Sequence, residues 1–360
     1  MKAIFIHVRQ GFESDAAEEI KDHLKLAEIS AASVDADAET AFVRVKLSDE
    51  DWQVARQKIK LEKLIFARQL LWQAAQINLP SDGDRASSII QAIQEHLLPS
   101  SGSNAFSALQ LETPDTDSSK ELSHFCKALT RPIENTLNKL KLLPKGKGAA
   151  HLPRINIVML TGQQASISLS DVGNSSPWTM GIPRLRFPPN APSRSTLKLE
   201  EAFHVFLGAT GMAQELRPQM LAVDLGACPG GWTYQFVQRG IQTIAVDNGA
   251  IDEKLMASGL VTHLREDAFK FRPHERVDWL VCDVVEQPSK ISALIADWFT
   301  HDYCKRSIFN LKLPMKQRYR ETKDCLRYLE TTVNASGRQL KIAAKQLYHD
   351  RKEVTVFCSF

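Results

Sequence analysis

The sequence predicts an α/β fold for the carboxyl-terminal half of the chain, preceded by α+β units. Five apolar, strand-like runs after residue 195 alternate with stretches of helix length, which is typical of a parallel sheet with helices on both faces. The last two β-rich runs have no helix between them, so we expect a hairpin that adds an antiparallel strand. Before residue 174, shorter strand and helix patterns alternate.

The 360 residues carry a formal charge of +3 and are 43% hydrophobic, as in globular proteins of two or three domains. No apolar run is long enough to cross a bilayer, and the first residues turn acidic too soon for a signal peptide. We therefore expect a cytoplasmic protein without a membrane partner. The six cysteines form no C-x-x-C pair and no His/Cys cluster, so neither disulfides nor a metal site is expected.

Residues 1–80 show the order β-α-β-α-β, which is typical of a ferredoxin-like α+β unit. Strands are expected at residues 3–8 and 41–47 and, long or interrupted, within 64–79. Apolar residues at helical spacing predict a helix from Glu13 onward, and Ser48 is placed to cap a second helix.

Residues 81–173 form a second unit, with helices expected at 85–98 and 118–142, a strand at 106–111 and two closing strands. A basic run lies between the second helix and the closing strands. It is either an RNA contact or a solvated loop, and the sequence leaves both open. Its cations are Lys139, Lys141, Lys145, Lys147 and Arg154.

Residues 174–195 contain five prolines, which disfavour regular helix and interrupt ladder pairing, so we expect a linker between domains. Residues 196–360 then form the α/β domain. Its parallel strands are expected at 221–227, 242–248, 261–267, 277–284 and 307–313, and its terminal hairpin within 338–360.

The strongest local signal is the run AVDLGACPGGWT, in which a buried strand leads into Gly226, Gly230 and Gly231. Glycines at the carboxyl end of a first parallel strand let the backbone approach a ligand closely. The spacing is neither G-x-G-x-x-G nor a Walker loop, which argues against a dinucleotide or nucleotide triphosphate.

Three aspartates end the next strands of the predicted sheet. Asp247 follows Gly226 by 21 residues, the position from which a carboxylate accepts hydrogen bonds from ribose hydroxyls. Asp267 and Asp283 end the third and fourth strands, so all three carboxylates meet the glycines at one edge. Each alone is explained by a helix cap, but together they predict a pocket for a nucleoside-containing cofactor.

Two lysines and a glutamate complete the predicted site. Lys312 ends an otherwise apolar strand, where a charge is costly unless it is paired or functional. Lys198 lies on the helix that enters the domain, and Glu353 begins the last strand; from spacing alone, both are equally well explained as solvated residues.

In these motifs the chain resembles the FtsJ-type family of S-adenosylmethionine-dependent RNA ribose 2′-O-methyltransferases. The motifs are DLGACPGGWT, AVDNG, DWLVCDV, NLKLP and RKEV, in this order. Over nearly its full length the chain is similar to the bacterial 23S rRNA cytidine 2′-O-ribose methyltransferases with an amino-terminal THUMP domain. The resemblance implies a Rossmann-like class I methyltransferase domain at 196–360, with a THUMP-like RNA-binding unit at 81–173.

The resemblance also implies the site residues and the partners. The implied catalytic tetrad is Lys312, Lys198, Asp283 and Glu353. The implied pocket for S-adenosylmethionine consists of Ser195, Cys228, Pro229, Gly230, Gly231, Asp247, Asp267 and Asp283. The implied substrate is a cytidine in the peptidyl-transferase region of 23S rRNA. The sequence leaves open whether the protein acts on naked rRNA or on a pre-ribosomal large-subunit particle. We expect a monomer without an obligate protein partner.

Elementary chemistry favours the same tetrad. A ribose 2′-hydroxyl is a poor nucleophile that must be aligned and relieved of its proton, and a lysine accepts a proton only when it is neutral. A second lysine and burial favour the neutral form, whereas the two carboxylates oppose it. No metal is required, because a sulfonium is already activated.

The sequence disfavours three alternative functions. An RNA base methyltransferase acting on an exocyclic amine needs an aromatic residue after the fourth strand, where this chain has DVVEQP, and C5 methylation needs a nucleophilic cysteine. A non-catalytic RNA-binding or ribosome-assembly factor has no need for Lys312 or the glycines. A dehydrogenase is disfavoured by the glycine spacing.

Overall fold

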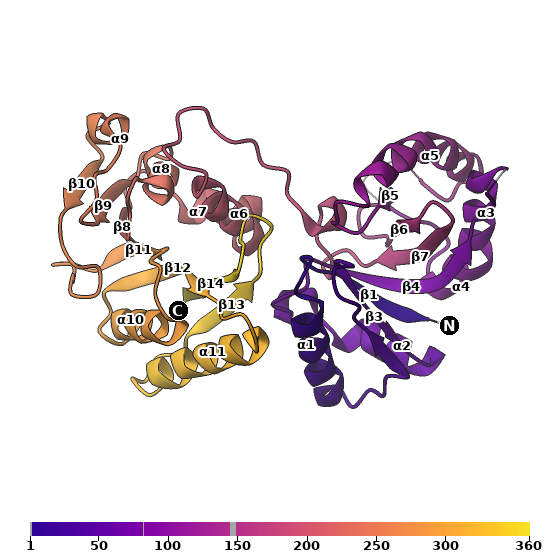
Figure 1. Cartoon of the computed structure of the whole chain (residues 1–360), viewed down its shortest axis with the longest axis horizontal. Coiled ribbons are helices and arrows are strands. Elements are labelled where there is room, and N and C mark those ends of the chain that lie inside the picture. The colour runs from indigo at the N-terminus through magenta and orange to yellow at the C-terminus, as the bar shows by residue number, and fades with distance from the viewer. Residues whose placement is uncertain (1, 82, 145–148) are drawn as a thin grey trace. The chain divides into compact units, whose positions relative to one another are not determined.

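The computed structural model describes residues 2–81, 83–144 and 149–360. The chain divides into two compact units, Met1–Pro183 and Arg184–Phe360 (Figure 1). Among the described residues, no helix combines the length and apolar character that crossing a membrane requires. Within the same residues, no three histidine, cysteine or acidic side chains are grouped as they would be to hold a metal ion.

The first unit is built on one seven-stranded sheet in the order β2-β3-β1-β4-β7-β6-β5. The two α+β units that the sequence predicts therefore share a sheet, because the long strand β4 pairs with β1 on one side and with β7 on the other. All pairings within this sheet are antiparallel except that of β5 with β6.

The elements of the first unit follow the predicted order, with the short strand β2 as an addition. They are β1 (Ala3–His7), α1 (Glu13–Leu26), β2 (Ser33–Asp35), β3 (Phe42–Lys46), α2 (Asp49–Lys58), η1 (Leu61–Lys63), β4 (Gln69–Asn78), α3 (Arg85–Ala92), the π-helical turn η2 (Ile93–Leu97), α4 (Leu98–Ser101), β5 (Leu109–Glu112), α5 (Lys120–Lys139), β6 (Arg154–Thr161), β7 (Gln164–Ser170) and η4 (Thr179–Gly181).

Two local details explain element boundaries in this unit. Ser48 caps α2 as predicted, since its side chain accepts a hydrogen bond from Asp51 N at 3.0 Å. Strand β4 starts at Gln69, and just before it the carboxylate of Glu19 accepts the backbone N–H groups of Ile65 and Phe66.

The first part of the proline-rich segment, expected as a linker, is bound to the first unit. The side chain of Asn174 accepts from Leu61 N at 2.8 Å and donates to Ile59 O at 2.9 Å. The buried amide of Gln69 accepts from Ser176 N and donates to Ser176 O. Prolines prevented regular structure here, and side chains of the first unit satisfy the backbone instead.

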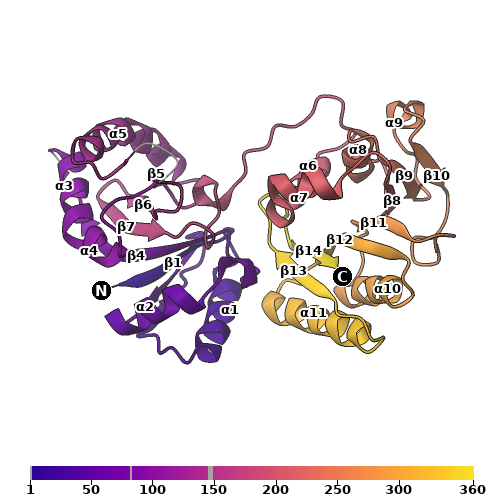
Figure 2. The same cartoon turned by 180° about the vertical axis from the view of Figure 1, so that it is seen from behind.

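The second unit is a seven-stranded sheet in the order β10-β9-β8-β11-β12-β14-β13. The five strands β8 to β12 pair in parallel, and β14 lies antiparallel between β12 and β13. This arrangement confirms the predicted parallel sheet with an antiparallel last strand. Figures 1 and 2 show helices on both faces of the sheet, α10 and α11 on one and α6, α7 and α8 on the other.

The elements of the second unit match the predicted runs. They are α6 (Thr196–Phe206), α7 (Gly208–Glu215), β8 (Leu221–Leu225), α8 (Gly231–Val237), β9 (Gln242–Val246), α9 (Glu253–Ala257), β10 (Val261–Leu264), β11 (Val277–Cys282), α10 (Pro288–Thr300), β12 (Cys304–Lys312), α11 (Arg318–Asn334), β13 (Lys341–Lys345) and β14 (Glu353–Ser359). Under α6, Phe203, Phe236 and Trp279 pack as a buried aromatic cluster that holds this helix against the sheet.

Candidate active site

Four charged side chains meet at the carboxyl edge of the second sheet. Lys312 ends β12 and faces Glu353, the first residue of β14, as its direct partner in the antiparallel ladder. Asp283 follows β11, which runs parallel to β12, so its side chain reaches the same edge. Lys198 comes from the first turns of α6. The structure thus brings together all four residues of the predicted tetrad.

The four side chains form a closed ring of alternating charge. The ammonium of Lys312 donates to Asp283 Oδ1 and to Glu353 Oε2. Lys198 Nζ pairs with Glu353 Oε1 and lies 3.4 Å from Asp283 Oδ2. Each carboxylate therefore bridges the two lysines, and the lysines stay apart on opposite sides of the ring.

The ring is sheltered but open on one side. The side chain of Glu353 is 5% exposed, whereas that of Lys312 is 21% exposed. Burial lowers the pKa of Lys312, but the charges and hydrogen bonds of Asp283 and Glu353 outweigh it and raise this pKa above its ordinary value. In the resting protein Lys312 is therefore an ammonium, held by two carboxylates at an accessible edge.

Asn310 is a site residue that the sequence analysis missed. Its Nδ2 donates to Asp283 Oδ1 at 2.9 Å, although the residue itself is completely buried. The signal was present in the sequence, because Asn310 precedes Lys312 by two residues and so points to the same face of the strand.

The predicted glycine loop forms a cradle without room for side chains. Gly226 has φ +76°, and a Cβ there would lie 2.6 Å from Val284 Cγ2. Gly230 has φ +111°, and a Cβ there would lie 2.5 Å from Leu255 Cδ1. Backbone conformation and close packing both require glycine at these positions, as expected where the main chain lines a ligand site.

Asp247 fastens the two loops of the cradle together. Its Oδ2 accepts from Cys228 N at 3.0 Å and its Oδ1 accepts from Gly249 N at 2.7 Å. The Cys228 thiol is exposed and donates to Ala250 O at 3.2 Å. The carboxylate that was predicted to bind a ribose thus also shapes the loop around it.

Of the remaining predicted pocket residues, Ser195 and Pro229 contact the residues of the cradle, whereas Asp267 bonds within its own turn. Ser195 packs on the glycine loop, because a Cβ on Gly231 would lie 2.1 Å from Ser195 Oγ. Pro229 accepts a hydrogen bond from Asp252 N at 3.0 Å. Asp267 is exposed, and its carboxylate accepts a hydrogen bond from Phe269 N, in its own turn, at 2.9 Å.

Asp224 is a second acidic residue that the sequence analysis did not select. It is buried in β8, just before the glycine loop, and accepts a hydrogen bond from Thr233 Oγ1 at 2.6 Å. Burial raises its pKa to about 7, and the charges of Asp283 and Asp247 act in the same direction. Its bond to α8 joins the first strand to the helix that begins at the cradle.

Comparison with known proteins agrees with this geometry. A family model described as FtsJ-like methyltransferase matches residues 191–311. Residues 84–171 match the model of the amino-terminal part of ribosomal RNA large subunit methyltransferase M, and residues 1–71 match the RlmM ferredoxin-like domain.

Curated relatives match over nearly the whole chain. The ribosomal RNA large subunit methyltransferase M of Pseudomonas fluorescens is 43% identical over 357 residues, which cover 99% of this chain and 96% of the relative. Those of Pseudoalteromonas translucida and Edwardsiella ictaluri are 41% and 43% identical, with 99% of this chain covered and 96% and 93% of the relatives. The chain belongs to the ribosomal RNA large subunit methyltransferase M family. This confirms the predicted methyltransferase class and the ferredoxin-like amino-terminal fold.

The basic run of this family member is only partly described. Lys139 ends α5 and Lys141 follows it, both exposed, whereas Lys145 and Lys147 lie outside the described residues. The guanidinium of Arg154 forms hydrogen bonds within the first unit: it donates to Ser175 Oγ at 2.8 Å and to Ser176 O at 2.6 Å. Arg154 therefore holds the segment after β7.

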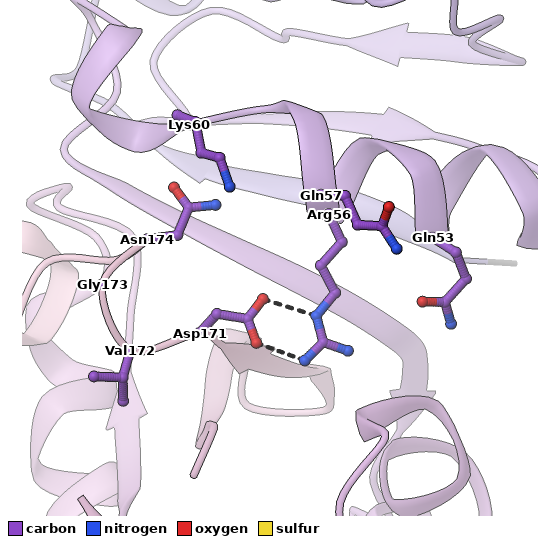
Figure 3. A pocket seen from close by; sticks show the side chains of 8 residues that line it. All are labelled: Gln53, Arg56, Gln57, Lys60, Asp171, Val172, Gly173 and Asn174. Atoms are coloured by element: carbon purple, nitrogen blue, oxygen red, sulfur yellow. Dashed lines mark hydrogen bonds and ion pairs between the residues drawn. The ribbon is translucent and has the colours of Figure 1, made fainter. Parts of the chain in front are cut away.

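A cavity of about 490 Å³ lies in the first unit, away from every predicted site residue. Arg56 and Asp171, which both line it, form a bidentate pair (Figure 3). Arg56 Nε donates to Asp171 Oδ2 at 2.7 Å and Nη2 donates to Oδ1 at 2.5 Å. Arg56 also donates to Ser100 O at 3.1 Å. The guanidinium of Arg56 is therefore already paired with a carboxylate.

Proposed function

We propose that the protein methylates the 2′-hydroxyl of a cytidine ribose in the peptidyl-transferase region of 23S rRNA, with S-adenosylmethionine as methyl donor. The observation that carries the proposal is the ring of Lys198, Asp283, Lys312 and Glu353 at the same sheet edge as the glycine cradle. The family resemblance and the names of the relatives supply the rRNA substrate.

The cradle fits such a cofactor. A Cβ on Gly226 or Gly230 would collide with a neighbouring side chain, so the main chain of the loop packs closely there. Asp247 presents carboxylate oxygens between the two loops. Cys228 is part of the glycine loop, and Ser195 packs against it. S-adenosylmethionine supplies an electrophilic methyl group on a positively charged sulfur, so the protein needs no metal to activate it.

The tetrad provides a base and fixes its position. In this proposal Lys312 takes the proton of the 2′-hydroxyl in its neutral form, which is a minor form at neutral pH because Asp283 and Glu353 raise its pKa. Lys198 lies on the far side of the ring and pairs with the same two carboxylates, Asp283 and Glu353. Its positive charge disfavours the protonated form of Lys312. The carboxylates orient Nζ toward the acceptor.

Base methylation at C5 has little support in the geometry. Cys282, next to Asp283, is completely buried, and burial raises the pKa of its thiol to about 12. A thiol of that kind is not a thiolate at neutral pH and does not act as the nucleophile that C5 chemistry requires.

RNA binding is assigned to the first unit, in which residues 81–173 resemble a THUMP domain. We propose that it acts as a cytoplasmic monomer on naked 23S rRNA or on a pre-ribosomal large-subunit particle.

The test uses 23S rRNA from cells that lack this protein, purified full-length protein and S-adenosylmethionine with a labelled methyl group. Nucleoside mass spectrometry is expected to find label in 2′-O-methylcytidine, and ribose-methylation mapping to place it in the peptidyl-transferase region. Label on a cytosine base would support the base methyltransferase instead. Tight rRNA binding without transfer to rRNA or particles would support a non-catalytic assembly factor.

A further inference from the structure

We propose that Asp350, Thr355 and Asn310 form a one-way chain of hydrogen bonds that positions Asp283, with a protonated Asp350 as the first donor. The inference rests on the proposed function, because Asp283 is a tetrad member. None of the three residues touches the open edge of the site, and Asp350, Thr355 and Asn310 are each 0% exposed.

The contacts run in one direction from the interior to the tetrad. Thr355 Oγ1 lies 3.0 Å from Asp350 Oδ2 and 3.1 Å from Asp350 Oδ1. The same hydroxyl lies 2.8 Å from Asn310 Oδ1. Asn310 Nδ2 then donates to Asp283 Oδ1 at 2.9 Å, the oxygen that also accepts from Lys312.

Counting protons decides the direction. An ionised Asp283 only accepts, so the Asn310 amide must face it with its NH₂ group and turn its carbonyl oxygen toward Thr355. The Thr355 hydroxyl has a single proton, which that carbonyl oxygen needs. Both contacts of Thr355 are satisfied together only if Asp350 is a carboxylic acid that donates to Thr355 Oγ1.

The surroundings of Asp350 favour this acid form. Burial is the main influence that raises its pKa well above the ordinary value, and the charges of Glu353 and Glu201 add to it. The hydrogen bond from Leu347 N and the charge of Lys198 lower this pKa, but by less. Its Oδ2 accepts from Leu347 N at 2.9 Å, which leaves Oδ1 for the proton. A third negative charge beside Glu353 and Asp283 is thereby avoided.

The chain of hydrogen bonds is expected to affect the protonation of Lys312. The hydrogen bond from Asn310 to Asp283 Oδ1 competes with Lys312 for the negative charge on that oxygen, and consecutive hydrogen bonds polarise one another. Without that donor, more of the negative charge on Asp283 faces Lys312, so Lys312 holds its proton more tightly. Asn310, Thr355 and Asp350 are positioning residues in this account.

The first test measures the acid directly and needs no activity. Carboxyl carbons of ¹³C-labelled aspartate in the full-length protein, assigned with Asp350→Asn, are followed by NMR from pH 5 to 9. We expect the Asp350 signal to stay that of a carboxylic acid through neutral pH. A carboxylate signal at pH 7 overturns the proposal, whether or not the protein methylates rRNA.

The second test breaks the chain at its middle and at its start. Thr355→Val removes the relay hydroxyl, and Asp350→Leu removes the first donor; each is expected to lower turnover about tenfold, the effect of one lost hydrogen bond. Asp350→Asn remains neutral and still donates to Thr355, so it is expected to recover most of the activity that Asp350→Leu loses. Thr262→Val, on the exposed face of β10, is the matched control.

The pH profile separates positioning from general damage to the fold. Thr355→Val is expected to move the rise of turnover toward higher pH, because Lys312 then holds its proton more tightly, while affinity for S-adenosylmethionine stays within about twofold. The proposal of a hydrogen-bond chain is overturned if the pH profile of turnover is unshifted in Thr355→Val, or if Asp350→Asn is as impaired as Asp350→Leu. A wild-type protein without methyl transfer contradicts the proposed function, and the NMR test then decides the chain alone.

Discussion

Lys312 and Glu353 lie directly opposite each other on the antiparallel strands β12 and β14, and the Lys312 ammonium donates to the Glu353 carboxylate. The antiparallel strand β14 of the terminal hairpin therefore places the Glu353 carboxylate beside the end of β12. The parallel strand β11, on the other side of β12, places Asp283 there. Lys312 is held between two carboxylates that come from the two strands on either side of its own strand.

Removing the base is expected to abolish the chemistry and leave the cofactor site intact. We predict that Lys312→Ala lowers turnover by ~10²–10⁴-fold, which corresponds to about 2.7–5.5 kcal/mol of activation free energy. Lys312→Arg is not expected to restore activity, because a guanidinium stays protonated. Single-turnover methylation of 23S rRNA and calorimetry with S-adenosylmethionine measure the two effects.

Lys305→Ala is the matched control for this substitution, since Lys305 lies at the other end of β12 and pairs with Asp278 at 2.7 Å. It is expected to methylate at the wild-type rate. A Lys312→Ala variant within a few-fold of wild type would transfer the role of base to Lys198 or to solvent.

The pH dependence of turnover follows from the direction of the Lys312 pKa shift. The pKa is raised, so the neutral amine is scarce at pH 7 and becomes more abundant as the pH increases. We predict that single-turnover rates rise about tenfold per pH unit from neutral into the alkaline range, until Lys312 titrates or the protein unfolds. A rate that is flat between pH 7 and 9 contradicts proton removal by this lysine in the rate-limiting step.

Asp247 is expected to contribute to cofactor affinity both directly and through the loops it joins. We predict that Asp247→Ala weakens binding of S-adenosylmethionine by about 1–3 kcal/mol, because charge-assisted hydrogen bonds to the ribose and to Cys228 N and Gly249 N are lost. Calorimetry measures the affinity, with the exposed Asp324→Ala on α11 as control. An unchanged affinity would remove Asp247 from the pocket.

The basic run is expected to contact rRNA phosphates. We predict that replacing Lys141, Lys145 and Lys147 with alanine reduces the slope of log affinity against log salt by roughly 0.7–0.9 per lost contact. Filter binding at several salt concentrations measures it. The same number of substitutions at Lys21, Lys25 and Lys58, in the helices α1 and α2, is the control. An unaltered slope would make the run a solvated loop.

His7 and Glu112 form a buried pair in the first unit. In the wild-type protein the effects of their two pKa shifts on the pH dependence of stability nearly cancel. Burial, followed by the charge of Arg68, lowers the pKa of His7 to about 3, while burial raises that of Glu112 to about 7. The two side chains approach to 3.6 Å. Below neutral pH the folded state binds a proton on Glu112 and the unfolded state binds one on His7, so the difference between them is small.

Substituting one member of the pair is expected to reveal the effect of the other on the pH dependence of stability. In Glu112→Gln only the unfolded state gains a proton below pH 6.5, so stability is expected to fall by roughly 1.4 kcal/mol per pH unit on acidification toward pH 4. In His7→Phe the folded state alone binds the proton, so stability is expected to fall as the pH rises from about 4.5 to 7. Hydrogen exchange of the β1 amides measures both, and equal pH slopes in the two variants would contradict the pairing.

The local sequence by itself determined the elements and the edge at which the site lies. Alternating apolar runs predicted every strand of the second sheet, and glycines 226, 230 and 231 after the first strand marked its ligand-binding end. Lys312 was identifiable because a charge at the end of an apolar strand requires a reason. These inferences depend on periodicity and on the cost of burying charge, both of which act over a few residues.

Only the tertiary structure decided which distant residues meet. Lys198 and Glu353 look like solvated residues in the sequence, and only packing of α6 and β14 against the sheet closes the ring with Asp283. The same holds for β4, which joins two predicted units into one sheet, and for Asp350, which donates toward the tetrad through Thr355 and Asn310 in our proposal. Contacts between residues far apart in the chain depend on strand order and register, which follow from the packing of the whole unit and leave no local pattern in the sequence.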